Sequence, residues 1–144
     1  MRYLILLLLM TGCTAQYDTY KPVTTLPAGF NKETVNHYLL TQYKNVLNEQ
    51  SRAIYYRDDR YLADEIVAEG SRTDVATNGI KIAIDCAILK CNQVILVHNH
   101  TGEYFAKPSG IDLDNADKFD AMMAQTHVTA AYVIVGGNDV NWIY

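Results

Sequence analysis

The stretch Val94-Ile-Leu-Val-His98-Asn-His100, followed by Ser109-Gly-Ile-Asp112, decides the fold of this 144-residue chain. Its apolar run predicts a buried strand. Successive side chains of a strand point to opposite faces, so the two histidines share one face at the strand end. The carboxylate of Asp112, delivered by the start of the next helix, would complete a set of three metal ligands. Such a set leaves a fourth tetrahedral position for water, which is typical of catalytic zinc.

A purely structural role for the same residues stays open at this point. Histidines at a strand end can hydrogen-bond to the backbone of a loop. The pattern Ser109-x-x-Asp112 before an amphipathic run is also typical of a helix capping box. The residue types alone therefore leave metal binding and local structure as alternatives.

Outward from this strand, hydrophobic periodicity predicts alternating helices and strands. We expect helices over residues 31 or 34–49, 78–90 and 112–125, and further strands over residues 53–57, 61–69, 130–135 and 140–144. Such alternation in a chain of this length predicts one α/β domain, a sandwich with helices packed on a central sheet. The candidate site would lie at the carboxyl end of a central strand.

Helical spacing also predicts which side chains face the core. In the three expected helices the inward residues are Val35, Tyr38, Leu39, Tyr43, Val46 and Leu47, then Ile80, Ala83, Ile84, Ala87, Ile88 and Cys91, then Ala116, Phe119 and Met123. These sets recur at three- and four-residue intervals, as the buried stripe of an amphipathic helix does.

Cys86 falls on the second of these helices, and Cys91 continues its apolar spacing directly after the expected end at residue 90. Five residues of helix separate two positions by about 7.5 Å along the axis, and their side chains face different ways. A disulfide requires closer Cα atoms, so we expect buried free thiols unless the helix ends before Cys91.

Residues 52–144 resemble the JAB/MPN domain, most closely its bacterial RadC-like branch. The similar segments are a first strand and turn, the histidine strand, the serine with the third ligand, and a late core strand, namely Glu65-Ile-Val-Ala-Glu69-Gly-Ser71, Gln93 to His100, Ser109-Gly-Ile-Asp112 and Ala131 to Gly136. The loop after His100 departs from the family pattern, because Thr101 replaces a proline and the serine follows one residue later. The resemblance implies a JAB/MPN-type three-layer sandwich, cytidine-deaminase-like, with a mixed central sheet.

The resemblance implies a zinc metallopeptidase that hydrolyses peptide or isopeptide bonds. Zn²⁺ would be bound by His98, His100 and Asp112. A catalytically silent JAB-type interaction module is the alternative, since family members without the ligands exist.

Further site residues follow from the same resemblance. Glu65 would be the base that activates water, with Glu69 on the same strand face as the reserve. Ser109 would donate a hydrogen bond to the oxyanion of the tetrahedral intermediate.

The N-terminus predicts export. A single positive charge at Arg2 precedes a leucine-rich run that is too short to span a bilayer. Thr11-Gly-Cys13 then resembles the lipobox of bacterial lipoproteins. We therefore expect a signal peptide over residues 1–12, lipidation of Cys13, a linker over residues 14–30 and the domain over residues 31–144, anchored at the outer membrane and facing the periplasm. An apolar first element of a cytosolic domain is the alternative.

Composition argues against a nucleic-acid partner. The chain has a formal net charge of −4, and without residues 1–12, which contain Arg2 and no acid, 11 basic residues face 16 acidic ones for a net charge of −5. Binding to nucleic acid depends on neutralising phosphates, which disfavours the remaining alternative of a cytosolic RadC-like protein linked to DNA. For an exported hydrolase we expect a peptidoglycan peptide or an envelope protein as the substrate.

Overall fold

The computed structural model describes residues 29–71, 77–101 and 106–143. The predicted signal peptide, Cys13 and most of the linker lie outside this part. The helices are α2 (Lys32–Tyr43), α3 (Gly79–Leu89) and α4 (Gly110–Ala124), and the strands are β1 (Gln50–Arg57), β2 (Arg60–Glu69), β3 (Gln93–His100), β4 (Thr129–Gly136) and β5 (Asp139–Trp142). Among the described residues, no helix combines the length and the apolar character that crossing a membrane requires.

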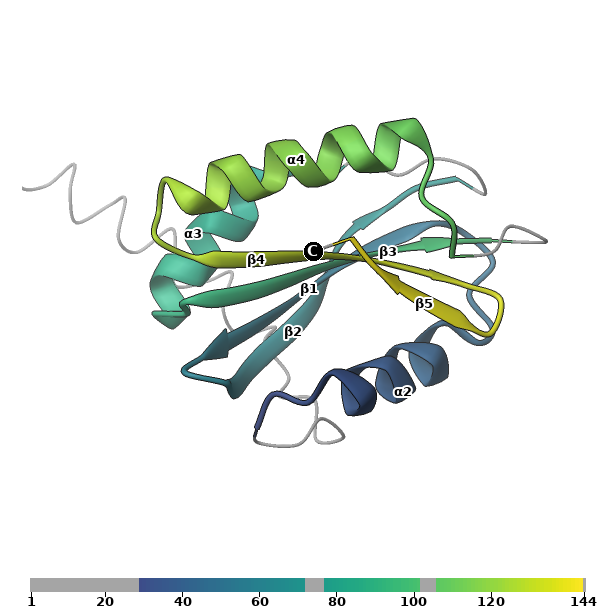
Figure 1. Ribbon diagram of the computed structural model, residues 1–144, viewed down its shortest axis with the longest axis horizontal. Helices are drawn as coiled ribbons and strands as arrows, with labels where there is room; N and C mark the ends of the chain where they lie inside the picture. Colours follow the sequence, from purple (N-terminus) through teal and green to yellow (C-terminus); the bar gives the residue numbers. More distant parts are fainter. Residues whose placement is uncertain (1–28, 72–76, 102–105, 144) are drawn as a thin grey trace, which may run out of the picture.

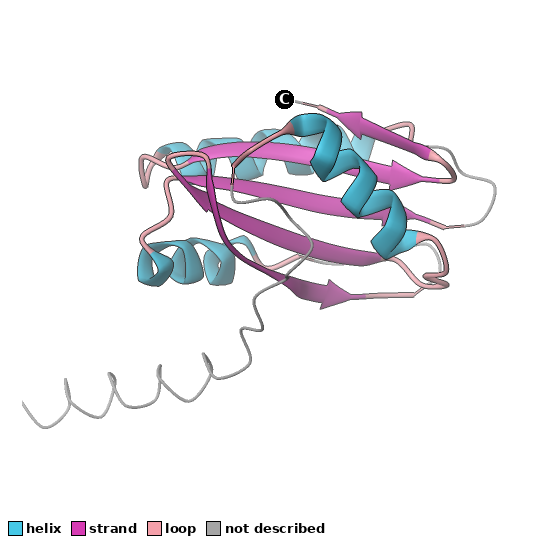
Figure 2. Cartoon of the chain, turned by 90° about the horizontal axis from the view of Figure 1, so that it is seen from below, coloured by secondary structure: helices cyan, strands magenta, loops and turns pink. Residues whose placement is uncertain are grey.

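The five strands form one mixed sheet in the order β2-β1-β3-β4-β5. Only β3 and β4 run parallel, whereas the other neighbouring strands pair antiparallel. In Figure 1, α4 lies above the sheet and α2 lies below it. Figure 2 shows the molecule from below, with α2 in front of the strands. These three layers, with β3 at the centre, confirm the predicted α/β sandwich.

Each face of the sheet has its own core. One cluster joins α3 and α4 to the sheet through residues such as Ile82, Cys86 and Phe119. The other joins α2 to the opposite face through Val35 and Leu39. The inward residues expected for α4 are buried as predicted, and so are the first four expected for α2.

Helix α2 is shorter than predicted. Asn31 caps it, but it ends at Tyr43 instead of Glu49. Leu47, expected in the core, is consequently 72% exposed. The residues after the helix lead into β1, so that Glu49 precedes a strand instead of ending a helix.

Helix α3 presents a different face from the one predicted. Ile80, Ile84 and Ile88 are exposed, whereas Ile82 and Asp85 are buried. Apolar residues lie on more than one side of this helix, and its buried side also carries Asp85, so apolar spacing could not define the inner face. In the observed orientation, Lys81 of α3 forms an ion pair with Glu65 of β2.

The cysteine prediction is also wrong, because Cys86 and Cys91 form a disulfide with a Cα–Cα distance of 4.9 Å. Helix α3 ends at Leu89, and Lys90 adopts a left-handed conformation with φ of 53°. This turn brings Cys91 back over the last helical turn, where its backbone N–H donates to the carbonyl oxygen of Cys86 at 2.8 Å. The early helix end thus removes the separation that disfavoured a bridge.

The described chain begins at the end of the sheet that carries the β1–β2 turn. Gly29 forms an isolated bridge with Arg60, and the Phe30 N–H donates to the carbonyl oxygen of Asp59 at 2.6 Å. The Phe30 ring packs edge-on against Tyr56, with ring centroids 5.5 Å apart. These contacts fix the position at which the described chain enters the domain.

Candidate metal centre

His98 and His100 lie together at the carboxyl end of β3. Residues of β3 in the same alternating set, such as Val94 and Leu96, belong to the core under α3 and α4, so both imidazoles point to that face. Their ring centroids are 5.1 Å apart, and the side chains are 9% and 14% exposed, respectively. The strand therefore presents two nearly buried imidazoles side by side.

Asp112 reaches the same place from the first turn of α4. Ser109 caps this helix: the backbone N–H and the hydroxyl of Ser109 both donate to Asp112 Oδ2, at 2.7 and 2.6 Å. Burial alone would raise the pKa of Asp112, but hydrogen bonds from His100 and Ser109 outweigh it and hold the pKa well below its ordinary value. The carboxylate is thus ionised, as a metal ligand must be.

The three side chains fit a metal ion. Asp112 Oδ2 lies 3.3 Å from His100 Nε2, and Asp112 Oδ1 lies 3.7 Å from His98 Nε2. One ligand atom from each of the three residues can be chosen so that all lie within 4.8 Å of one another. Ligand atoms about 2.1 Å from a tetrahedral zinc ion lie about 3.4 Å from each other, which is close to the observed spacing. The predicted ligand residues are therefore brought together as expected, together with the capping box that was the alternative.

A fourth side chain, Glu49, meets this group. Its Oε2 atom is 3.7 Å from His98 Nε2, and its side chain is only 10% exposed. The backbone of Glu49 pairs with the chain that follows β2, since its N–H donates to Ser71 and its carbonyl oxygen accepts from Gly70. Sequence reasoning missed this residue because it assigned Glu49 to a helix end. The available signal was that this glutamate directly precedes the residues of β1, the strand that pairs with β3.

The pKa of Tyr132 on β4 responds to the negative charges of this region. Burial raises the pKa of the Tyr132 phenol, and the carboxylates of Asp112 and Glu49 raise it further. Both carboxylates thus act on the same buried region. Carboxylates within 3.3 to 3.7 Å of imidazole nitrogens form a set of groups that favours a bound cation.

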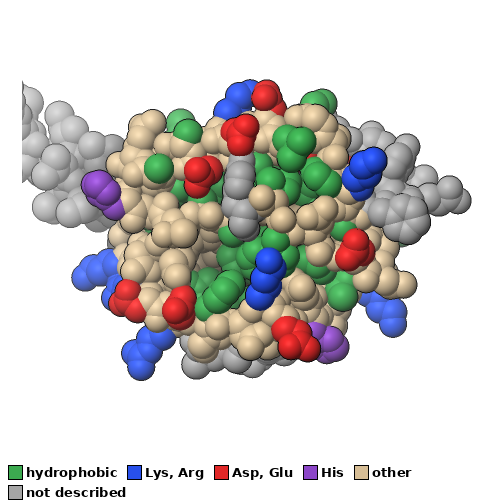
Figure 3. All heavy atoms as spheres, viewed as in Figure 1, with side chains coloured by type: hydrophobic (Ala, Val, Ile, Leu, Met, Phe, Trp, Pro, Cys, Tyr) green, Lys and Arg blue, Asp and Glu red, His purple; other side chains and the backbone are tan. Residues whose placement is uncertain are grey.

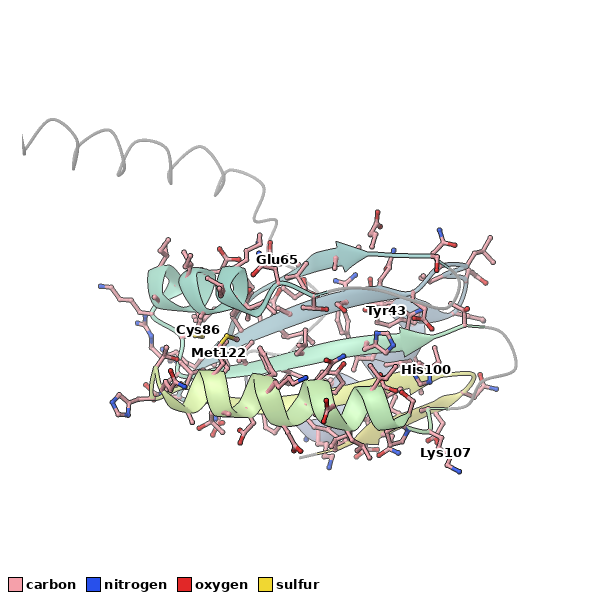
Figure 4. All side chains as sticks on the ribbon, turned by 90° about the horizontal axis from the view of Figure 1, so that it is seen from above. Tyr43, Glu65, Cys86, His100, Lys107 and Met122 are labelled. Carbon is pink, nitrogen blue, oxygen red and sulfur yellow. A yellow bond between two sulfur atoms is a disulfide. The ribbon has the colours of Figure 1, made fainter. Side chains whose placement is uncertain are left out.

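The structure corrects the expected position of Glu65. It pairs with Ala53 on β1, whereas His98 pairs with Ser51, so Glu65 is two strands from β3 and displaced along the sheet. Its Oε1 atom accepts from Tyr55 at 3.1 Å and from Lys81 at 2.8 Å. Figure 4 shows Glu65 beside α3, away from His100 at the end of β3.

The reserve residue Glu69 also lies outside the group. Its Oε1 atom accepts from the side-chain amide of Gln50 at 2.9 Å. Among the described residues, the possible metal ligands that come together are the two histidines and the aspartate alone. Glu49, which approaches His98 without joining that set, has the placement expected for Glu65.

Fold and site together define an α/β domain with a candidate metal centre of two histidines and one aspartate at the end of its central strand. The model of the RadC-like JAB domain family matches residues 30–141. The chain therefore belongs to the RadC-like JAB domain family. No curated protein matches the chain.

Proposed function

We propose that this chain is a zinc-dependent hydrolase of peptide or isopeptide bonds that works in the bacterial envelope. The observation that carries the proposal is the meeting of His98, His100 and Asp112 with the carboxylate of Glu49 at one strand end. Three ligands with a nearby carboxylate that is not among them are the parts that metal-assisted amide hydrolysis requires.

Zinc bound by these ligands would lower the pKa of water to about 7 and polarise the substrate carbonyl group. Glu49 is the proposed base in place of Glu65. It accepts a proton from the attacking water while the oxygen–carbon bond forms. It then donates this proton to the leaving nitrogen as the carbon–nitrogen bond breaks.

Ser109 has two parts in this proposal. Its hydroxyl proton is donated to Asp112, and its oxygen accepts from the Asp112 N–H at 3.2 Å, so it orients the third ligand. Stabilising an oxyanion, as the family resemblance implies, requires the same hydroxyl to turn from Asp112 towards the substrate.

The proposed location rests on the lipoprotein-like N-terminus with Cys13 and is supported by the disulfide Cys86–Cys91, since structural disulfides are typical of oxidising compartments outside the cytoplasm. On the part of the molecular face visible in Figure 3, Lys and Arg side chains are scattered among acidic ones, which does not favour nucleic acid. Peptidoglycan cross-links and envelope proteins are the proposed substrates, with lipidated Cys13 as the anchor.

Elemental analysis of the purified chain tests the proposal. We expect about one zinc ion per chain, and none in His100→Ala. Absence of zinc after exposure to excess metal would overturn it in favour of a silent interaction module. For the location, Cys13→Ser should accumulate as an unprocessed precursor, whereas an intact Met1 on cytosolic protein would contradict export.

A further inference from the structure

Asn99 lies between the two histidines on β3, and its side chain points to the opposite face. It is 2% exposed. Its Oδ1 atom accepts from the backbone N–H of Gln50 at 2.6 Å, and its Nδ2 atom donates to the backbone carbonyl of Asn48 at 3.2 Å. The side-chain amide thus binds both peptide groups that flank the Cα atom of Glu49.

These contacts replace a main-chain ladder that has ended. Strands β1 and β3 pair only as far as Ser51 and His98, so Asn99 has no backbone partner on β1. Beyond that point the Asn99 side chain provides the connection between the histidine strand and the chain at Glu49. The outer side of the same two peptide groups is bound by Ser71 and Gly70.

All four hydrogen-bonding groups of these two peptides therefore have partners: Glu49 N–H donates to Ser71 and its carbonyl accepts from Gly70, while Asn99 takes the other two. A backbone held on both sides has little freedom to rotate. The direction in which the Glu49 side chain leaves the backbone is fixed relative to β3, and so relative to the ligands that β3 carries.

We infer that Asn99 is a positioning residue that sets the distance of the Glu49 carboxylate from the metal centre without binding metal or substrate itself. This role rests on the proposed function, in which Glu49 is the base. The expected effect is large for a residue without substrate contact, because a displacement of about 1 Å can cost on the order of 100-fold in rate.

Asn92 provides a matched control. It precedes β3 at the other end of the sheet, and its side chain makes the same kind of paired contact with the turn after β1. Its Oδ1 atom accepts from the Asp58 N–H at 2.9 Å, and its Nδ2 atom donates to Asp58 Oδ1 at 2.7 Å. Asn92→Ala therefore also removes two hydrogen bonds, here between the start of β3 and the turn after β1, which lies far from the candidate metal centre.

The test compares Asn99→Ala with Asn92→Ala by NMR in the full chain loaded with Co²⁺. This paramagnetic ion shifts the signal of each nearby nucleus by an amount that depends on the position of that nucleus relative to the ion. We expect bound Co²⁺ in both variants, with altered shifts of the Glu49 and Gln50 amides only in Asn99→Ala. Hydrogen exchange of the Gln50 amide should accelerate at least about tenfold in that variant alone. Asn99→Asp, which keeps the acceptor for Gln50 but loses the donor to Asn48, should fold and shift the same amides.

Hydrolysis gives the second measurement. In Asn99→Ala, kcat should fall on the order of 10- to 100-fold with KM nearly unchanged, and this loss should vanish in the Glu49→Gln background. Equal shifts in both variants, or loss of Co²⁺ from Asn99→Ala, would overturn the positioning role. A wild-type chain that binds Co²⁺ but cleaves no amide would contradict the proposed function, while the amide shifts still decide the role of Asn99.

Discussion

Two groups of acidic side chains on the same side of the sheet differ in the base that they surround. At the end of β3, Asp112 and Glu49 approach the imidazoles of His98 and His100. At the edge of the sheet, by contrast, acids gather around an ammonium group. There Lys81 Nζ lies 2.8 Å from Glu65 Oε1 and 2.6 Å from Asp85 Oδ2 (Figure 4 labels Glu65 and His100).

The central base distinguishes a candidate metal site from a cluster of ion pairs that stabilises the fold. A lysine carries its own positive charge and offers no lone pair, so the group around Lys81 is an ion-pair network that ties α3 to β2. Neutral imidazoles offer lone pairs, and beside carboxylates they make a ligand set for a cation. We therefore expect changes at the candidate metal centre to abolish zinc binding and the proposed hydrolysis, and changes around α3 to lower stability.

The largest expected contrast is between Asp112→Ala and Asp85→Ala. The first removes a proposed metal ligand and should abolish both zinc binding and the proposed hydrolysis. The second removes a partner of Lys81 and should lower the melting temperature while zinc content stays near one per chain. Elemental analysis beside thermal unfolding measures both. Zinc retained in Asp112→Ala would break the distinction.

The two glutamates give the next contrast. Glu49→Gln should keep zinc but reduce hydrolysis by roughly 10²- to 10⁴-fold, because proton transfer is lost. Glu65→Gln should hydrolyse at a rate close to that of the wild type. Steady-state kinetics on zinc-loaded protein checks this pair, and an inactive Glu65→Gln with active Glu49→Gln would restore the sequence-based assignment.

Two isoleucines of α3 sharpen the stability side. Ile82 is buried completely, whereas Ile84 is 50% exposed. Ile82→Ala should lower the free energy of unfolding by about 2–5 kcal/mol, and Ile84→Ala should change it by no more than about 0.5 kcal/mol. Urea denaturation measures both. Equal losses would mean that α3 buries the face predicted from the sequence.

Reduction of the disulfide Cys86–Cys91 should have a smaller effect. A loop this short contributes about 2 kcal/mol on the chain-entropy estimate. The bridge closes the end of α3 and does not touch the metal centre, so reduced protein should melt at a lower temperature with unchanged zinc content. Zinc lost on reduction alone would link the two regions.

The smallest expected effect is the pH dependence of Glu65. Burial raises the pKa of Glu65 above 4.5, and the hydrogen bond with Asp85 raises it further, despite the opposing effect of Lys81. Because the folded-state pKa is raised, the stabilisation is complete below the unfolded pKa and is lost as the pH rises through the folded one. Relative to wild type, Glu65→Gln should therefore gain stability in thermal unfolding as the pH rises through the raised folded-state pKa of Glu65. A relative loss would show that the ion pair with Lys81 dominates.

The sequence predicted what depends on local periodicity. Two-residue alternation placed His98 and His100 on one face, and the serine-to-aspartate spacing put Asp112 on the first turn of a helix. The strands, their order along the chain and the inner face of α4 follow from the same patterns.

What the sequence could not predict depends on where elements stop. Val46 and Leu47 continue the helical spacing past Tyr43, so the pattern gave no sign that Glu49 leads into a strand. The sequence pattern likewise gave no sign of the left-handed turn at Lys90, which permits the disulfide. The inner face of α3 is also the side from which Lys81 contacts Glu65, and a contact between two different elements leaves no mark on the spacing within the helix.

The bridge between Gly29 and Arg60 fixes the geometry of attachment. From Arg57, beside this bridge, to Ser51, beside His98, the chain takes six strand steps, or about 20 Å. Gly29 therefore lies at the end of the sheet opposite the candidate metal centre. In the proposed hydrolase, the point at which the described chain enters the domain is thus separate from the end of the sheet that a substrate would approach.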